Sequence, residues 1–233
     1  MAALAEGPTM TVLRCILSLS LLSGGAAAAQ DRDWSGPMAG ASLGIARGEQ
    51  TVPETALSFE TAFPGPAFAE VAGATAEDTA AAASAFAGYR WQSGAWVGGV
   101  TFEVEGTRLE AEYDGTSAAG RDIPGGTFEV DAALRAMGEL GYASGPNLFT
   151  LAAGPAAVRG TARTTGVEGT GYSVRLGWDR AVSQNMLVGV ALTHTGLDGF
   201  DELDVADIVG DRVGSQDVDM DYQTLAVRLT YEF

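Results

Sequence analysis

After residue 30 the chain repeats one pattern, in which apolar and polar side chains alternate over short stretches. Alternation with a period of two is typical of β-strands whose two faces meet different surroundings. Helical periodicity is scarce, and no apolar run reaches the roughly 18 residues that a membrane-spanning helix needs. The pattern therefore predicts an all-β fold. It recurs in eight stretches: 37–46, 83–91, 95–105, 127–142, 148–158, 171–180, 186–196 and 222–233.

The connections between these stretches differ in length in a regular way. Short polar turns follow the second, fourth and sixth stretches, at 92–94, 143–147 and 182–185. Longer segments follow the first, third, fifth and seventh, at 47–82, 106–126, 159–169 and 197–221. In a closed antiparallel sheet, all the short turns would lie at one end, as in outer-membrane barrels. We therefore expect an eight-stranded antiparallel transmembrane β-barrel with short periplasmic turns and long extracellular loops.

Periodicity alone does not say which face of such a barrel points inward. An inward apolar face would make a soluble, lipocalin-like barrel, and an outward one a membrane barrel. The aromatic residues favour the membrane barrel, because most of those with apolar parity flank the short-turn end, where rings would lie at lipid headgroup level. Trp34 precedes the first strand at that end. The expected aromatic girdle comprises Trp91, Trp96, Tyr142, Phe149 and Trp178.

The other face of the strands carries ionisable side chains of both signs. In a narrow bore of low dielectric these charges must pair, because an unpaired buried charge is unfavourable. Eight strands leave a bore that side chains can fill, so we expect no substantial open pore. The expected lumen charge network is Arg90, Glu103, Glu105, Glu129, Asp131, Arg135, Glu139, Arg175, Asp179, Arg228 and Glu232.

The amino-terminal segment has the anatomy of a secretory signal peptide. Arg14 precedes the apolar run 15–22, and the small residues 24–29 follow it. Met10 is a better start than Met1, because the residues between them add an acid where a signal peptide needs positive charge. The expected division of the chain is a signal peptide at 1–29 and an outer-membrane β-barrel at 30–233.

Both ends of the expected barrel carry motifs of a known family. The segment WSGPMAG at 34–40 resembles the Trp-x-Gly-x-Tyr-x-Gly opening of small alphaproteobacterial outer-membrane barrels, which are porin-like, with Met38 in place of the usual aromatic. The terminal residues are similar to the signal that the barrel-assembly machinery recognises: Leu225, Val227, Leu229, Tyr231 and Phe233. The resemblance implies an eight-stranded, outer-membrane protein A-like transmembrane barrel in the outer membrane of the cell. Its expected partners are the assembly machinery, outer-membrane lipid and lipopolysaccharide.

Composition excludes several kinds of activity. The chain has 30 acidic residues and 13 basic ones, and every basic residue is Arg. Its net charge of −17 would repel nucleic acid. One His and one Cys cannot build a zinc site, a disulfide framework or a Cys/His dyad. We expect no cofactor and no enzymatic activity. The expected role is structural support of the envelope, or interaction through surface loops.

Two other functions remain open. The first is a narrow channel for ions or small solutes, in which the lumen salt bridges exchange partners. The second is a lipid A-modifying enzyme, since deacylases of this size use a His with a Ser two residues on. Here Gly196 stands where that Ser would follow His194, and His194 has lipid-facing parity. A soluble periplasmic ligand-binding barrel is the alternative at the level of the fold.

The long segment 197–221 holds nine acids and one basic residue, Arg212. Asp217, Asp219 and Asp221 alternate, so they share a strand face and would offer oxygen ligands to Ca²⁺ or Mg²⁺. Such an ion would bridge the loops to lipid phosphates, whereas the alternative is a solvated, repulsive rim. The Ala- and Pro-rich stretch 63–85 is expected to carry a short helix.

Overall fold

The computed structural model describes residues 32–52, 55–59, 67–71, 74–116, 122–162, 165–200 and 219–233. The chain divides into two compact units, Met1–Arg32 and Asp33–Phe233, and the second contains all the described strands. The signal peptide expected at 1–29 lies outside the described residues. No helix in the described part of the chain is long and apolar enough to cross a membrane.

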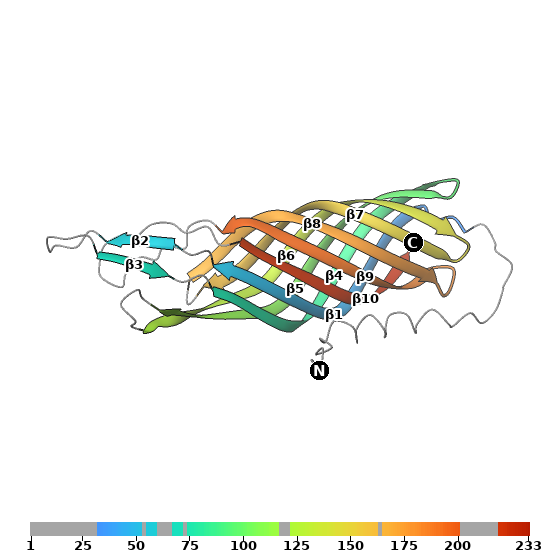
Figure 1. Ribbon diagram of the computed structural model, residues 1–233. Helices are drawn as coiled ribbons and strands as arrows, with labels where there is room; N and C mark the ends of the chain where they lie inside the picture. The colour runs from blue at the N-terminus through green and yellow to red at the C-terminus, as the bar shows by residue number, and fades with distance from the viewer. Residues whose placement is uncertain are drawn as a thin grey trace, which may run out of the picture. The chain divides into compact units, whose positions relative to one another are not determined.

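Eight tilted strands close into an antiparallel barrel, which confirms the predicted fold (Figure 1). Each barrel strand pairs with the barrel strands that come before and after it in the chain, and the first barrel strand pairs with the last. The barrel strands are β1 (Gly36–Val52), β4 (Ala74–Ser93), β5 (Trp96–Thr116), β6 (Asp122–Ser144), β7 (Asn147–Ala162), β8 (Thr165–Ala181), β9 (Met186–Phe200) and β10 (Asp219–Glu232). Two further strands, β2 (Thr55–Phe59) and β3 (Ala67–Val71), pair with each other in a separate sheet.

The short turns all lie at one end of the barrel, as predicted. The turns at 94–95 and 145–146 join β4 to β5 and β6 to β7, and the residues 182–185 join β8 to β9. Gly94 has φ of 61° and Gly145 has φ of 57°, a left-handed conformation that glycine adopts without steric strain. These glycines explain why the chain reverses at those points.

The strands extend farther beyond the opposite end than the sequence pattern predicted. β5 continues to Thr116 and β6 begins at Asp122, so most of the expected loop at 106–126 is strand. Outward residues of this extension, such as Arg108 and Glu110, are charged and exposed. The alternation of apolar and polar residues seen nearer the short turns is therefore lost here. The helix expected at 63–85 is wrong, because β3 and the first half of β4 occupy the described part of that stretch.

The two faces of the strands differ as a membrane barrel requires. Large apolar side chains point outward and are exposed, among them Leu43, Phe102 and Leu176. Arginines at the alternate positions, such as Arg90 and Arg135, are completely buried in the barrel. A soluble barrel would have the reverse arrangement, because its apolar face would fill the interior. The outward apolar face is therefore the lipid-facing belt.

Candidate functional site in the barrel lumen

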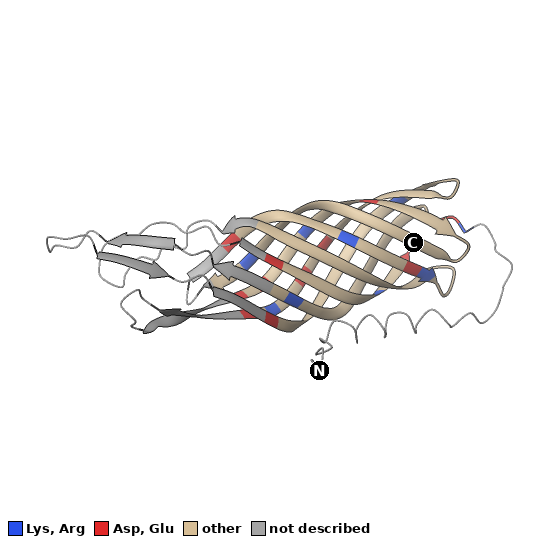
Figure 2. Ribbon diagram, in the orientation of Figure 1, with Lys and Arg blue, Asp and Glu red and all other residues tan. Residues whose placement is uncertain are grey.

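The charged residues that face the bore lie in two groups along the barrel, where Figure 2 shows strand segments of both signs. Of the eleven residues expected in this network, eight are buried: Arg90, Glu103, Glu105, Arg135, Glu139, Arg175, Asp179 and Arg228. The side chain of a ninth, Glu232, is 13% exposed. We call these nine residues the charged layer.

Arg90 on β4 contacts acids from three other strands. Its Nε donates a 2.7 Å hydrogen bond to Glu139 Oε1, and its Nη2 donates a 3.0 Å hydrogen bond to Asp179 Oδ2. Its Nη1 lies 3.8 Å from Glu232 Oε1. A single buried cation thus links β4, β6, β8 and β10 near the short-turn end.

Arg135 on β6 is the centre of a second group, nearer the long-loop end. Its Nη1 donates to Glu103 at 2.9 Å, and its Nη2 donates to Glu105 and to the Tyr222 hydroxyl, both at 2.7 Å. Its Nε donates to Ser173 Oγ at 3.1 Å. Every nitrogen of this guanidinium therefore has an acceptor, which offsets the unfavourable burial of its charge.

Glu103 also connects Arg135 to Arg175, because its second oxygen accepts a 2.5 Å hydrogen bond from Arg175 Nη2. Arg175 Nε donates to Thr193 Oγ1 at 3.2 Å. The carboxylate of Glu103 thus lies between two cations that would otherwise repel each other. The ion pairs of this group join β5, β6 and β8 across the bore.

Arg228 differs from the other three lumen arginines. Its guanidinium carbon lies 4.1 Å from the centre of the Phe86 ring, a cation–π contact. Within the described part of the chain, none of its three nitrogens has a hydrogen-bond partner, although the residue is 2% exposed. Gly40 leaves room for the ring, since a Cβ there would lie 2.5 Å from Phe86 Cζ. Arg228 is therefore a buried cation held by an aromatic face.

Glu129 and Asp131 do not join the charged layer, which corrects the prediction from parity. An irregularity between Val130 and Ala132 adds one residue to β6 relative to β7, so the faces exchange at Asp131. Val130, which strict alternation with Glu129 and Asp131 would place on the lipid face, is fully buried inside the barrel. Asp131 is exposed and accepts a 3.0 Å hydrogen bond from Thr161 Oγ1. Glu129 pairs in register with the exposed Glu110 and so shares its outward face.

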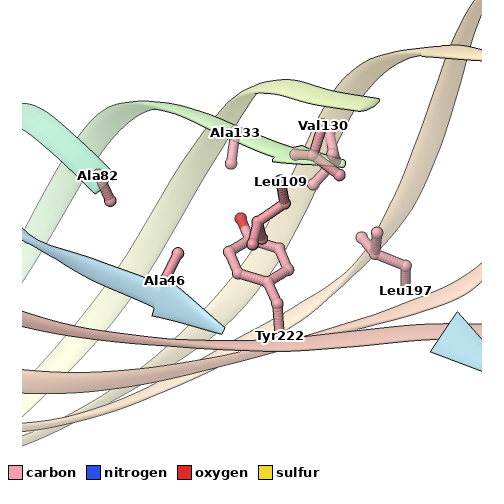
Figure 3. Close-up of a cluster of buried hydrophobic side chains, with 8 residues drawn as sticks. Ala46, Ala82, Leu109, Val130, Ala133, Leu197 and Tyr222 are labelled. Atoms are coloured by element: carbon pink, nitrogen blue, oxygen red, sulfur yellow. The ribbon is translucent and has the colours of Figure 1, made fainter. Parts of the chain in front are cut away.

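Apolar side chains close the bore above the charged layer, at the long-loop end. Figure 3 shows residues from several strands pointing into the space around the Tyr222 ring. The members of this outer apolar layer are Ala46, Ala82, Leu109, Val130, Ala133, Val158, Leu197 and Tyr222. Sequence reasoning missed this layer, although Leu109 has the same parity as Glu103 and Glu105 and could have indicated it.

A second set of apolar side chains closes the bore at the short-turn end. The members of this inner apolar layer are Trp34, Val97, Leu148 and Leu187, with Ala143 and Ala181 packed against them. Trp34, placed by the sequence analysis at the girdle end of the first strand, instead lies inside the barrel and is 1% exposed. Its backbone N–H donates a 2.8 Å hydrogen bond to Gln92 Oε1, which fixes the segment before β1 to the first short turn.

Together the three layers place buried side chains along the bore. Between the two apolar layers the low dielectric strengthens the ion pairs of the charged layer.

The outer surface at the short-turn end carries the expected aromatic residues. Trp96, Tyr142, Phe149 and Trp178 pair directly in register across β5, β6, β7 and β8, and so form one continuous row. The Trp96 and Tyr142 rings meet edge to face with centroids 5.5 Å apart. Trp91 on β4 is 52% exposed beside this row. The row fits the level of lipid headgroups, where a ring can be half apolar and half hydrated.

The residues of the expected assembly signal lie on the outward face of the last strand. Tyr231 and Phe233 stack edge to face, with centroids 4.9 Å apart, at the short-turn end of β10. Val227 and Leu229 are exposed farther up the strand, and Leu225 is half-buried. All five lie beside the seam where β10 pairs with β1.

His194 lies on the outward face of β9, in the half of the barrel that carries the long loops. Its Nε2 is 3.8 Å from Asp221 Oδ1, and its ring lies 6.0 Å from the Tyr172 ring. In the described residues no three His, Cys, Asp or Glu side chains gather as metal ligands would. Asp217 lies outside the described residues, and only the backbone of Asp219 is described.

Comparison with known proteins adds a family and a set of similar folds. A family model described as outer membrane protein beta-barrel domain matches residues 16–233. The crystal structure of OprG from Pseudomonas aeruginosa is similar, with 12% identity and a TM-score of 0.50 over 85% of this chain and 96% of OprG. Neisserial surface protein A gives 14% identity and a TM-score of 0.48 over 85% of this chain and 98% of that one. No curated protein matches the chain.

Proposed function

The chain belongs to the outer membrane protein beta-barrel domain family, and from this premise we propose that it is a non-enzymatic barrel that supports the envelope or presents surface loops. Membership places the protein in the outer membrane. What supports the proposal is the packing of buried side chains in the bore, with Trp34 toward one end and Leu109 and Tyr222 toward the other, because apolar constrictions oppose the passage of ions. A closed barrel offers its outer surface and its loops for interaction.

The energetic argument rests on the charged layer. Arg90 and Arg135 each hold two or more acids from other strands, so the ion pairs link the barrel across its bore. Separating such a pair would leave an uncompensated buried charge, which is strongly unfavourable. The ion pairs therefore oppose opening of the barrel. The layer therefore supports a role in which rigidity matters.

Conductance of the purified full-length protein in planar bilayers tests the proposal. We expect no stable openings, even at high salt. A variant that thins both apolar layers, Trp34→Ala with Leu109→Ala and Leu197→Ala, is the positive control and should admit ions. Steady conductance by the natural sequence would contradict a sealed bore.

One observation favours the narrow channel as a second candidate. Arg228 is buried with no hydrogen-bond partner in the described residues, and water in a narrow path would supply one. If the natural sequence conducts and Arg228→Leu alters ion selectivity, the channel replaces the sealed barrel as the function.

The enzyme alternative depends on His194. Gly196 stands where a deacylase of this kind would carry its Ser, and the near neighbours of His194 are Asp221 and Tyr172. We expect His194→Ala to leave the lipid A profile of the cell unchanged. A changed lipid A profile would support a lipid A-modifying enzyme as the function.

A further inference from the structure

Two arginines in the bore carry donors that no acceptor meets. Within the described residues, none of the three nitrogens of Arg228 has a hydrogen-bond partner, and Nη1 of Arg175 has none either. Arg228 is 2% exposed and Arg175 is 1% exposed. A guanidinium has five N–H donors and no acceptor. Buried donors of a charged group are strongly unfavourable when unpaired, so these nitrogens need an acceptor beyond the side chains that surround them.

Gly177 on β8 brings a third polar group to the same place. Gly177 pairs in register with Thr150 on β7 and is the next inward residue after Arg175. A Cβ on Gly177 would lie 3.9 Å from Arg228 Nη1 and would clash with Thr150 Oγ1. Thr150 is buried, and its hydroxyl has no hydrogen-bond partner in the described residues. A nitrogen from β10 and an oxygen from β7 therefore lie close together beside Arg175, around a position that carries no side chain.

The charged groups around this point do not balance. Three of the five acids in the charged layer surround Arg90. Glu103 and Glu105 remain for the other three arginines, and both already accept hydrogen bonds from arginines other than Arg228. Asp179 Oδ1 has no hydrogen-bond partner in the described residues, but it lies against β9 and beyond salt-bridge distance of Arg228. Positive charge is therefore in local excess at Arg228.

A small anion supplies what these donors need. Water enclosed in the bore would bring as many donors as acceptors, so it cannot reduce an excess of donors. The Phe86 ring lies 4.1 Å from the Arg228 guanidinium carbon, but its face offers no lone pair. A halide brings only acceptors, and its charge offsets that of the cation. We propose that the bore binds chloride, or another monovalent anion of that size, between Arg228, Arg175 and Thr150. The anion is enclosed as the barrel closes, so the site does not require conductance.

Urea unfolding of the full-length protein in lipid vesicles tests the site, with chloride exchanged for the bulky anion gluconate at constant ionic strength. Above the dissociation constant of the site, each tenfold rise in chloride should raise the folding equilibrium constant about tenfold, because the anion binds the folded state alone. Arg228→Leu should remove this dependence and, in gluconate, be at least as stable as the natural sequence. Arg159→Gln, which changes an exposed ion pair with Glu168, is the control and should keep the dependence.

A second variant and a direct observation decide the question if Arg228→Leu does not fold. Thr150→Val keeps the shape of the side chain without its hydroxyl, and should weaken chloride binding about tenfold. Thr107→Val is its matched control, since that buried hydroxyl donates to the backbone of Ala81. Crystals of the natural sequence grown in bromide should show an anomalous scattering peak beside Arg228. The proposal would be overturned by a natural sequence whose stability ignores chloride, by a dependence that Arg228→Leu or Thr150→Val retains in full, or by bromide crystals without that peak.

Discussion

The Tyr222 hydroxyl lies 2.7 Å from Arg135 Nη2, and this hydrogen bond joins the outer apolar layer to the charged layer beneath it. The Tyr222 ring packs among apolar side chains (Figure 3), while its oxygen accepts a hydrogen bond from the buried Arg135. One side chain therefore belongs to both layers. Its two roles can be separated by removing the oxygen alone.

Tyr222→Phe should destabilise the folded barrel by about 2 kcal/mol, because a hydrogen bond from a charged donor is lost while the ring stays. The free energy of unfolding is measured by urea titration of the barrel in lipid vesicles. Tyr142→Phe, which changes an exposed ring on the outer surface, is the control and should shift the value by no more than about 0.5 kcal/mol. If Tyr222→Phe left the free energy of unfolding unchanged, the hydrogen bond from Arg135 to Tyr222 would not contribute to stability.

Arg135→Leu should be much more harmful, costing about 3–5 kcal/mol, because Glu105 would remain buried without its cation and Glu103 would keep only Arg175. The same titration measures it. Replacing Glu105 as well, by Gln, should recover part of the loss, because Glu103 stays paired with Arg175. If the single variant were as stable as the natural sequence, the charged layer would not be a stabilising network.

Arg228→Leu should have the opposite outcome, with stability unchanged or increased. This cation has no acid within salt-bridge distance in the described residues, so leucine removes an unfavourable buried charge. The loss of the contact with Phe86, about 2 kcal/mol at most, opposes that gain. A loss as large as that of Arg135→Leu would show that Arg228 has a strong partner in solution.

Trp34→Ala should open the inner apolar layer and cost about 3–5 kcal/mol, the usual range for deleting a buried large aromatic side chain. The outer apolar layer would remain, so this single variant should still not conduct. Hydrogen exchange of the Gln92 amide should rise, because its N–H donates a 2.9 Å hydrogen bond to Ser35 Oγ, in the segment that the buried Trp34 side chain anchors. If hydrogen exchange there stayed unchanged, the Trp34 side chain would not be what holds the segment before β1 in place.

Gel mobility of the protein from isolated outer membranes should depend on heating. A barrel closed by its first and last strands resists detergent until it is boiled, since no edge is open for unfolding to begin. The unboiled and boiled forms should therefore migrate differently. Recovery in the soluble periplasm, with no shift, would contradict a lipid-facing apolar surface.

The alternation of side chains predicted the barrel, its strand order and most of the charged layer. Arg90, Arg175 and Arg228 were placed correctly inside because each lies on a regular stretch of strand with large apolar neighbours on both sides. Such neighbours fix the parity of everything between them. The distances between charged groups could not be predicted, since they depend on the register of strands far apart in the chain.

Glu129 and Asp131 show where this reasoning fails. The extra residue in β6 exchanges the inward and outward faces of the strand. Nothing in the amino-acid sequence around Val130 distinguishes a bulge from a regular strand. Trp34 was misplaced for another reason, because it precedes the strand and parity does not apply to it. The strand ends above the lipid belt were missed because water, not lipid, faces their outward side chains.

The pairing of β1 with β10 also sets the order of events during biogenesis. Met38 lies opposite Glu232, so the two ends of the barrel sequence meet in one seam. The seam cannot form until the last strand has been made and exported, and until then both of its edges have bare N–H and C=O groups, which hydrocarbon cannot satisfy. A chain that stopped before β10 would therefore be an open sheet, liable to aggregate, and not a smaller barrel.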